Sequence, residues 1–291
     1  LLPTILLPND DGSLVATTDS TPIIRRLENE FTERRIVPND PALAFINYLL
    51  EDFGDEWVTK YMFHYRWYFK EDADVAGTIL PLVDIGINTP NEMHAKYKEF
   101  VSKRQIDRLW VVGSNDDTAK FIDSSYKRFL NLMEDHLLNS PFLLGTKPSS
   151  SDFSFYGQLT QLVGFDPTPR KIAYEYSLRT VAWVDILDDL SGHDAENTAW
   201  TKLEDSPESL KNLLKEVGKM YIPALLSNAQ ALENGDEIWE MNIDNAVWKQ
   251  KTFPYQAKCL KWIKNEFDLL NQEDKKRVLD FLDDTGCETI L

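Results

Sequence analysis

The chain has 291 residues, of which 43% are hydrophobic and 27% are charged. This composition excludes wholesale disorder, and the length predicts about two domains. The formal net charge of -17 argues against a protein that binds a nucleic-acid backbone or anionic lipid, because both need clustered Lys and Arg. A small anionic ligand stays compatible with this charge, because one helix N-terminus can act locally against the overall field.

Two cysteines, Cys259 and Cys287, are too few for a disulfide framework, and this usage predicts a cytoplasmic location. No apolar run reaches the ~18 residues of a membrane-spanning helix. Residues 1–7 lack the basic region and the cleavage site of a signal peptide. The first residue is not Met, so we expect the chain to begin part-way into a longer protein.

The first 36 residues predict a β-hairpin followed by a helix. Residues 4–7 form an apolar, β-branched run, residues 9–12 are typical of a turn, and residues 13–17 are expected to form the second, antiparallel strand. The helix is expected to begin at Ser20, a suitable N-cap, with Pro22 in its first turn. An isolated two-stranded hairpin is marginal in water, so we expect this one to belong to a larger sheet that this chain does not otherwise contain.

Residues 41–232 predict an all-helical body. Apolar periodicity places helices at 41–70, 91–109, 118–138, 153–163, 177–190 and 207–232. The segment 71–89, which contains Gly and Pro, is expected to leave the helical body without forming a regular element. The segment 166–169 is expected to end the fourth of these helices. Capping boxes are predicted at Thr89–Glu92 and at Ser149–Asp152, where each side chain satisfies backbone donors of the other.

Residues 235–291 predict an extension made of a second hairpin and two helices. Apolar and polar residues alternate over 238–243, and the chain returns at Val247 and Trp248 after a turn at Asp244 and Asn245. Helices are expected over about 255–269 and 272–285. The expected fold class is therefore mostly α, with a partial α/β piece at the start.

Three local patterns carry a family resemblance. The first is Leu2-Pro3 before the first strand, and the second is the run Asp19-Ser20-Thr21-Pro22-Ile23 at a strand-to-helix turn. The third is the run 141–145 followed by the capping box at 149–152. Their order and spacing resemble the glutathione transferase superfamily. The match covers residues 1–33 and 41–230.

The resemblance implies a fold in three parts. Residues 1–36 would be the end of a thioredoxin-like domain, residues 41–232 the helical domain of the family, and residues 235–291 an extension. The family's first β-α-β unit would precede Leu1. The residue that activates the glutathione thiol belongs to that unit, so no catalytic residue is assigned in this chain.

The resemblance also implies a glutathione site. The backbone of Leu2 would pair with the cysteinyl part of glutathione, and Pro3 would be the family's cis-proline. Ser20 would hold the γ-glutamyl carboxylate, and Asp19 would face its ammonium group. The unpaired N–H groups and dipole of a helix start attract a carboxylate on physical grounds as well. The alternative is that Asp19 and Ser20 form a simple helix cap.

The implied function is a glutathione transferase that joins glutathione, its co-substrate, to a small hydrophobic electrophile. The family is usually dimeric, so we expect a homodimer, with no nucleic acid, no membrane and no metal as partner. One alternative is a non-catalytic scaffold or ligand-binding protein. Another is a glutathione-dependent thiol reductase whose cysteine lies in the absent segment.

Phe63, Arg66 and Trp67 are the weakest candidate site. In the family this region walls the electrophile pocket, and Arg66 among aromatic rings suits an anionic acceptor. The alternative is an aromatic core in which Arg66 bridges two domains.

Four acidic residues, Glu51, Asp52, Asp55 and Glu56, cluster on one predicted helix. His64 does not stand at a metal-binding spacing from them, so we expect a solvated or Lys-paired face with Glu56 and Lys60 as one pair. Cys259, on an apolar helix face, is expected to be a buried structural cysteine. Cys287 follows a helix end, where the dipole disfavours a thiolate.

Overall fold

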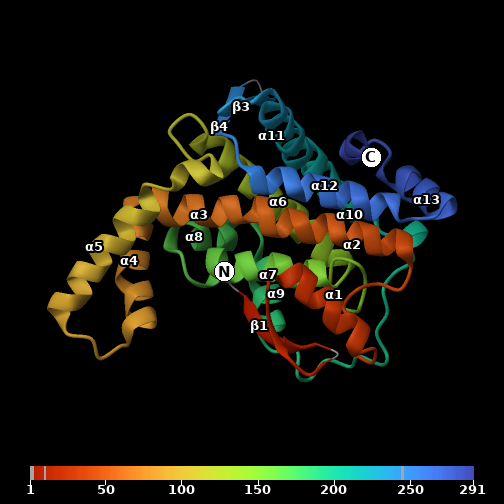
Figure 1. Cartoon of the computed structure of the whole chain (residues 1–291), viewed down its shortest axis with the longest axis horizontal. Helices are drawn as coiled ribbons and strands as arrows, with labels where there is room; N and C mark the ends of the chain where they lie inside the picture. Colours follow the sequence, from red (N-terminus) through yellow and green to blue (C-terminus); the bar gives the residue numbers. More distant parts are fainter. Residues whose placement is uncertain (1–2, 10, 244–245) are drawn as a thin grey trace.

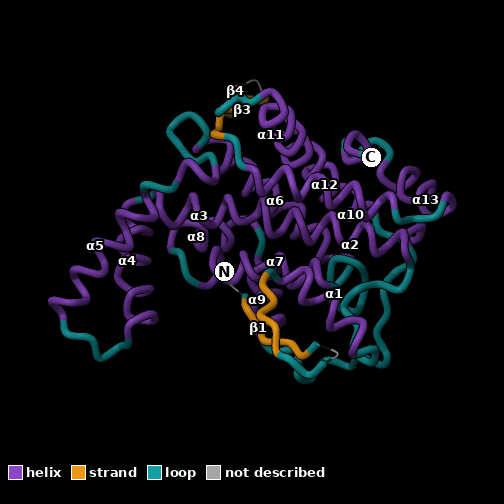
Figure 2. The backbone as a smooth tube through the Cα atoms, in the orientation of Figure 1, coloured by secondary structure: helices purple, strands orange, loops and turns teal. Residues whose placement is uncertain are grey.

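The computed structural model describes residues 3–9, 11–243 and 246–291. Helices dominate it, and its described strands form two separate antiparallel pairs (Figure 2). The prediction of a mostly helical chain with a small β-containing start is therefore confirmed. The strands are β1 (Thr4–Pro8), β2 (Leu14–Thr18), β3 (Ile238–Ile243) and β4 (Ala246–Lys251). The helices are α1 (Ser20–Glu30), α2 (Pro41–Phe53), α3 (Thr59–Tyr68), α4 (Lys70–Ile85), α5 (Asn91–Ile106), α6 (Ala119–Asn139), α7 (Ser150–Gly164), α8 (Pro167–Tyr176), α9 (Leu178–Asp188), α10 (Glu208–Glu216), α11 (Ile222–Asn234), α12 (Pro254–Asp268) and α13 (Gln272–Leu282).

The predicted N-terminal hairpin is present as β1 and β2, which pair from Thr4 opposite Thr18 to Pro8 opposite Leu14. Gly12 in the connecting loop has a φ of +79°, a conformation that glycine adopts without steric penalty. Over the described residues no further strand joins this pair, and whether a larger sheet forms outside this chain stays a prediction. Helix α1 follows the hairpin directly.

The long helix predicted over 41–70 is α2 and α3 joined by one π-helical turn, Gly54–Val58. Helix α2 lies against α7 here, and a Cβ on Gly54 would stand 2.2 Å from Ser154 Oγ. A second π-helical turn, Val217–Tyr221, joins α10 to α11, and a Cβ on Gly218 would stand 2.0 Å from the Thr285 carbonyl oxygen. At both turns a glycine allows another segment to approach the backbone closely.

The expected excursion at 71–89 is a helix. It is α4, and with α5 it forms a helical hairpin that projects from the body (Figure 1). The capping box predicted at Thr89–Glu92 is wrong, because the Thr89 hydroxyl donates to the Ile85 carbonyl at 3.1 Å. Thr89 thus closes α4, while Glu92 pairs with Lys96 along the surface of α5.

Residues 166–169 do end α7, but they also begin α8, which the sequence pattern did not predict. Pro167 is the first residue of α8, where a missing N–H has no hydrogen bond to lose. The second hairpin is confirmed as β3 and β4, with Ile238 opposite Lys251. Its predicted turn residues, Asp244 and Asn245, lie outside the described residues.

The extension shares the hydrophobic core of the helical body. Buried side chains from β3, β4, α12 and α13 belong to the same cluster as those of α2, α6 and α7. Trp248, for example, lies with its ring centroid 5.5 Å from that of Trp57. Figure 1 shows α12 running beside α2. Across the described part of the chain, no helix combines the length and the apolar character needed to cross a membrane.

Candidate functional site

The start of α1 is built around a strained residue. Asp19 is the N-cap of α1 with φ 79° and ψ 129°, a conformation that non-glycine residues rarely adopt. Its Oδ1 accepts the Thr21 N–H at 3.2 Å, and its own N–H donates to the Pro3 carbonyl at 3.3 Å. The structure therefore brings Pro3 and Asp19 together, as the sequence pattern requires. Leu2, the remaining predicted backbone contact, lies outside the described residues.

Ser20 is half-buried, and within the described chain its hydroxyl has no hydrogen-bond partner. The neighbouring Thr21 hydroxyl is engaged, because it donates to Glu51 Oε1 at 2.8 Å. The two adjacent hydroxyls thus differ in role. Thr21 holds α1 against α2, whereas the Ser20 hydroxyl is unengaged and Ser20 is not among the residues that line the cavity described next.

A cavity of about 630 Å³ lies beside Asp19, between the start of α1, the end of α2 and the helix α12. This volume falls in the ~300–1,000 Å³ range of small-molecule sites. Its walls are acidic and aromatic, with one arginine. The residues that carry this character are Asp19, Arg25, Tyr48, Asp52, Asp55, Glu56, Tyr255, Trp262 and Glu266.

The extension forms one wall of this cavity. The Tyr255 hydroxyl at the start of α12 donates to Asp19 Oδ2 at 3.1 Å. Trp262 lies about two turns further along the same face of α12, and its ring centroid is 5.9 Å from that of Tyr255. Sequence reasoning missed both residues, because no local pattern links positions that are 236 residues apart.

Of the solvated or Lys-paired face that we expected, the solvated form is wrong, because α1 and α12 cover this stretch of the chain. Lys60 does act on Glu56, since its charge lowers the pKa of that carboxyl against the larger effect of burial. Burial raises the pKa of Asp52 well above its usual range, and Asp52 accepts a hydrogen bond from the Tyr221 hydroxyl at 2.5 Å. Burial also raises the pKa of Asp55 to about 7 and that of Glu56 above its usual value. The cavity wall therefore carries less negative charge at neutral pH than its formal count suggests.

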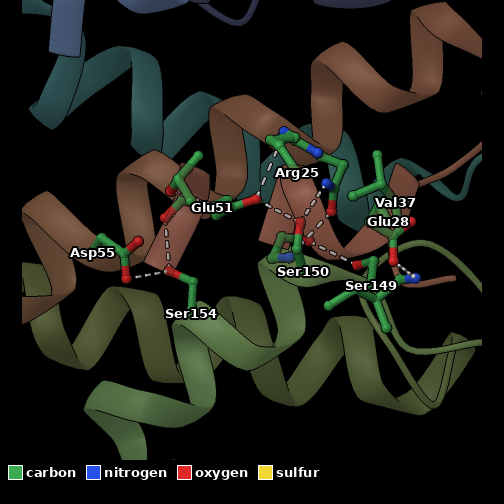
Figure 3. A network of polar contacts seen from close by, with 12 residues as sticks. Arg25, Glu28, Val37, Glu51, Asp55, Ser149, Ser150 and Ser154 are labelled. Atoms are coloured by element: carbon green, nitrogen blue, oxygen red, sulfur yellow. Dashed lines mark hydrogen bonds and ion pairs between the residues drawn. The ribbon is translucent and has the colours of Figure 1, made fainter. Parts of the chain in front are cut away.

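A buried polar network fixes α1 to the helical body (Figure 3). Glu51 on α2 accepts hydrogen bonds from Thr21 and, at 2.5 Å, from the Ser150 hydroxyl at the start of α7. The guanidinium of Arg25 lies 3.7 Å from the same carboxylate. Ser154 adds a 3.0 Å hydrogen bond to Asp55 Oδ1. The cavity is thus built on anchored elements rather than on a loose loop.

The capping box at Ser149 and Asp152 is present at the start of α7. The Asp152 carboxylate accepts the backbone N–H groups of Ser149 and Leu143, each at 2.8 Å. All of these groups are buried. The pair therefore holds the chain before α7 and does not face the cavity.

None of Phe63, Arg66 and Trp67 is among the residues that line the cavity beside Asp19. Arg66 instead forms a two-pronged ion pair with Asp166, with both contacts at 2.9 Å, which ties α3 to the α7–α8 corner. Trp67 lines a separate cavity of about 840 Å³ between α3 and the projecting hairpin. Arg66 therefore joins helices within the predicted helical domain of residues 41–232, and the ion pair does not bridge two domains.

The two thiols are free and buried. Burial raises the pKa of both, that of Cys287 to about 12, so neither is a nucleophile at neutral pH. Across residues 3–9, 11–243 and 246–291, no three or more His, Cys, Asp or Glu side chains are grouped as they would be around a metal ion.

In comparisons with known proteins, no family model matches this chain, and neither the curated proteins nor the solved structures contain a match.

Proposed function

We propose that the chain is a glutathione transferase-like protein that binds glutathione at the start of α1. The observation that carries this proposal is the backbone strain at Asp19, φ 79°, beside the cavity of about 630 Å³. Strained residues persist where the surrounding structure holds them for a function. The proximity of Pro3 and the unpartnered Ser20 hydroxyl add support from independent contacts.

The lining of the cavity suits a ligand that carries an ammonium group, a carboxylate and an apolar part. The ammonium group of glutathione would face Asp19 in the cavity wall, and one carboxylate would face the start of α1, where the Ser20 hydroxyl lies next to the lining residues and not among them. Tyr48, Trp262 and Leu269 offer an apolar wall for a hydrophobic electrophile. No described residue is assigned to thiol activation.

The test is isothermal titration of the protein with glutathione, with and without the double substitution Asp19→Ala and Ser20→Ala. We expect about tenfold weaker binding or worse in the double variant, since it loses both polar contacts. The matched control is Asp135→Ala with Ser191→Ala, two exposed residues away from the cavity. Unchanged affinity in the first variant, or an equal loss in the control, would contradict the site.

A partner-binding scaffold is the second candidate, and one observation favours it. Large apolar side chains on and beside the projecting α4–α5 hairpin are exposed, among them Val83 at 72% and Ile87 at 89%. Surface apolar groups gathered on one projection are typical of interaction sites. The reductase alternative places its cysteine outside this chain, and the buried Cys259 and Cys287 do not bear on it.

The proposal keeps a homodimer and a cytoplasmic location, where free thiols are common. Light scattering of the purified chain measures the first of these directly. A mass of two chains would agree with the proposal, and a mass of one chain would contradict the dimer while leaving the glutathione site to the titration above.

A further inference from the structure

A third, smaller cavity lies beside the start of α7. Its volume is about 210 Å³, and it is enclosed by the linker after α1, the residues just before α7 and the loop after α9. Its polar lining consists of Arg34, Arg35, Lys147 and His193, and Phe153 and Leu187 supply apolar walls.

The charge of this cavity is opposite to that of the whole molecule. The chain contains 48 acidic and 31 basic residues, yet all four titratable side chains of the cavity are basic, and no Asp or Glu is among its described lining residues. In the cavity beside Asp19 the balance is the reverse, with five acidic side chains and one arginine. The small cavity is therefore a local positive site on an acidic protein.

Two of these four basic groups, Arg34 and Lys147, are not neutralised by the described residues. Arg34 and Lys147 form no ion pair with the described residues, and Lys147 Nζ lies 4.3 Å from the centre of the Trp200 ring instead. Arg35 alone contacts a carboxylate, that of Glu28 at 3.2 Å. Asp194, beside His193 in sequence, accepts the N–H groups of Glu196 and Asn197, and the charge of His193 also helps to lower the pKa of its carboxyl.

One polar atom in this cavity's lining is left without a partner. His193 Nε2 is buried and makes no hydrogen bond with the described residues, while its ring packs edge-on against Phe142 with centroids 5.4 Å apart. A buried polar atom left unpaired costs about 1–3 kcal/mol. An oxygen of a bound ligand would satisfy it.

We propose that this cavity binds a small organic anion with one phosphate or carboxylate group and a short apolar part. Arg34, Lys147 and His193 would surround the anionic group, and Phe153 and Leu187 would contact the apolar part. The volume is below the ~300–1,000 Å³ of sites for larger ligands, so a nucleotide is too large. This proposal is independent of the glutathione site and extends beyond it.

The experiment titrates the full chain with phenyl phosphate, benzoate and the neutral benzyl alcohol, using calorimetry. We expect at least one of the two anions to bind about tenfold more tightly than the alcohol, and the tighter anion identifies the headgroup. The double substitution Arg34→Ala and Lys147→Ala is expected to lower the affinity for that anion by about tenfold or more. Glutathione affinity is expected to stay unchanged in this variant, which separates the two sites.

The matched control is Lys120→Ala with Lys171→Ala, which removes the same charge from two exposed lysines outside the cavity. It is expected to keep the anion affinity of the parent chain. His193→Phe keeps a ring against Phe142 but lacks Nε2, and we expect it to lower the affinity for the anion as well. The proposal is overturned if neither anion binds more tightly than the alcohol, or if the control loses as much affinity as the Arg34 and Lys147 variant.

Discussion

At the scale of single residues, Asp19 combines an N-cap with a backbone conformation that favours glycine. Asp19→Ala removes the carboxylate that accepts the Thr21 N–H and keeps a Cβ at φ 79°. Asp19→Gly removes the same carboxylate but relieves the strain. We therefore expect the glycine variant to be more stable than the alanine variant by about 1 kcal/mol.

Urea unfolding of the two variants measures this difference in the free energy of unfolding. Ser13→Ala and Ser13→Gly, at an exposed position with no positive φ, provide the control pair, and there we expect alanine to be at least as stable as glycine. An alanine variant of Asp19 that is more stable than the glycine variant would show that the position is not strained.

Lys60 is a second residue whose environment has a measurable consequence. It is 2% exposed, its Nζ lies 5.4 Å from the centre of the Trp57 ring and 5.9 Å from that of Trp248, and burial lowers its pKa to about 8. Between pH 8 and its ordinary value of 10.5, the unfolded chain binds more protons at this group than the folded chain does. The free energy of unfolding therefore rises with pH through this window, by at most about 3 kcal/mol.

The substitution Lys60→Met removes this contribution while filling most of the same space. We expect the variant, compared with the parent chain, to be relatively more stable at pH 7 than at pH 10. Urea unfolding at the two pH values gives the comparison. If parent and variant change in parallel between the two pH values, Lys60 is not a buried cation with a lowered pKa.

At the scale of elements, the start of α7 depends on one carboxylate. Asp152 is fully buried and accepts two backbone N–H groups that would otherwise lack partners. Asp152→Ala leaves both donors buried and unsatisfied, so we expect a loss of about 3–5 kcal/mol in the free energy of unfolding. Asp152→Asn keeps one acceptor oxygen and should lose less.

Chemical denaturation of both variants gives the ranking, with the exposed Asp135→Ala as a control that we expect to stay within about 0.5 kcal/mol of the parent chain. An alanine variant as stable as this control would mean that the buried donors find other partners.

Elements with strong local signals could be predicted from the sequence. Helix α6 lies at Ala119–Asn139 against an expected 118–138, and α9 lies at Leu178–Asp188 against an expected 177–190. The elements that were missed carry proline. Pro81 stands inside α4 and Pro167 begins α8, and in sequence both resemble breaks. Proline ends a helix or begins one according to its surroundings, which local patterns do not contain.

The candidate site shows the same limit more sharply. Asp19 and Pro3 were identifiable because they sit in a short, ordered pattern. Tyr255 and Trp262 were not, since they reach the cavity only when α12 packs along α2. The acidic residues of α2 were expected to be solvated for the same reason, because nothing local indicates that α1 and α12 cover them.

At the scale of the whole molecule, the extension of residues 235–291 and the helical body share one hydrophobic core, so we expect them to stabilise each other. The extension contributes Trp239, Trp248, Ile263 and Val278 to the cluster that contains the centre of α2 and α6. Removing such contacts from either side leaves large cavities, which typically lower stability by several kcal/mol. The extension and the body should therefore unfold in one cooperative transition.

The two cysteines allow this to be measured, because both lie in the extension and both are buried. We expect Cys259 and Cys287 to become reactive toward a thiol reagent only at the denaturant concentration where the helical signal of the whole chain is lost. Trp248→Ala, which removes a buried ring beside Trp57, should lower both midpoints together.

Thiols that react well before the helical signal falls would show that residues 235–291 open as a separate unit, since local opening exposes buried groups at lower free energy than global unfolding. That result would leave the cavity beside Asp19 with a movable wall, because Tyr255 and Trp262 belong to the part that opens.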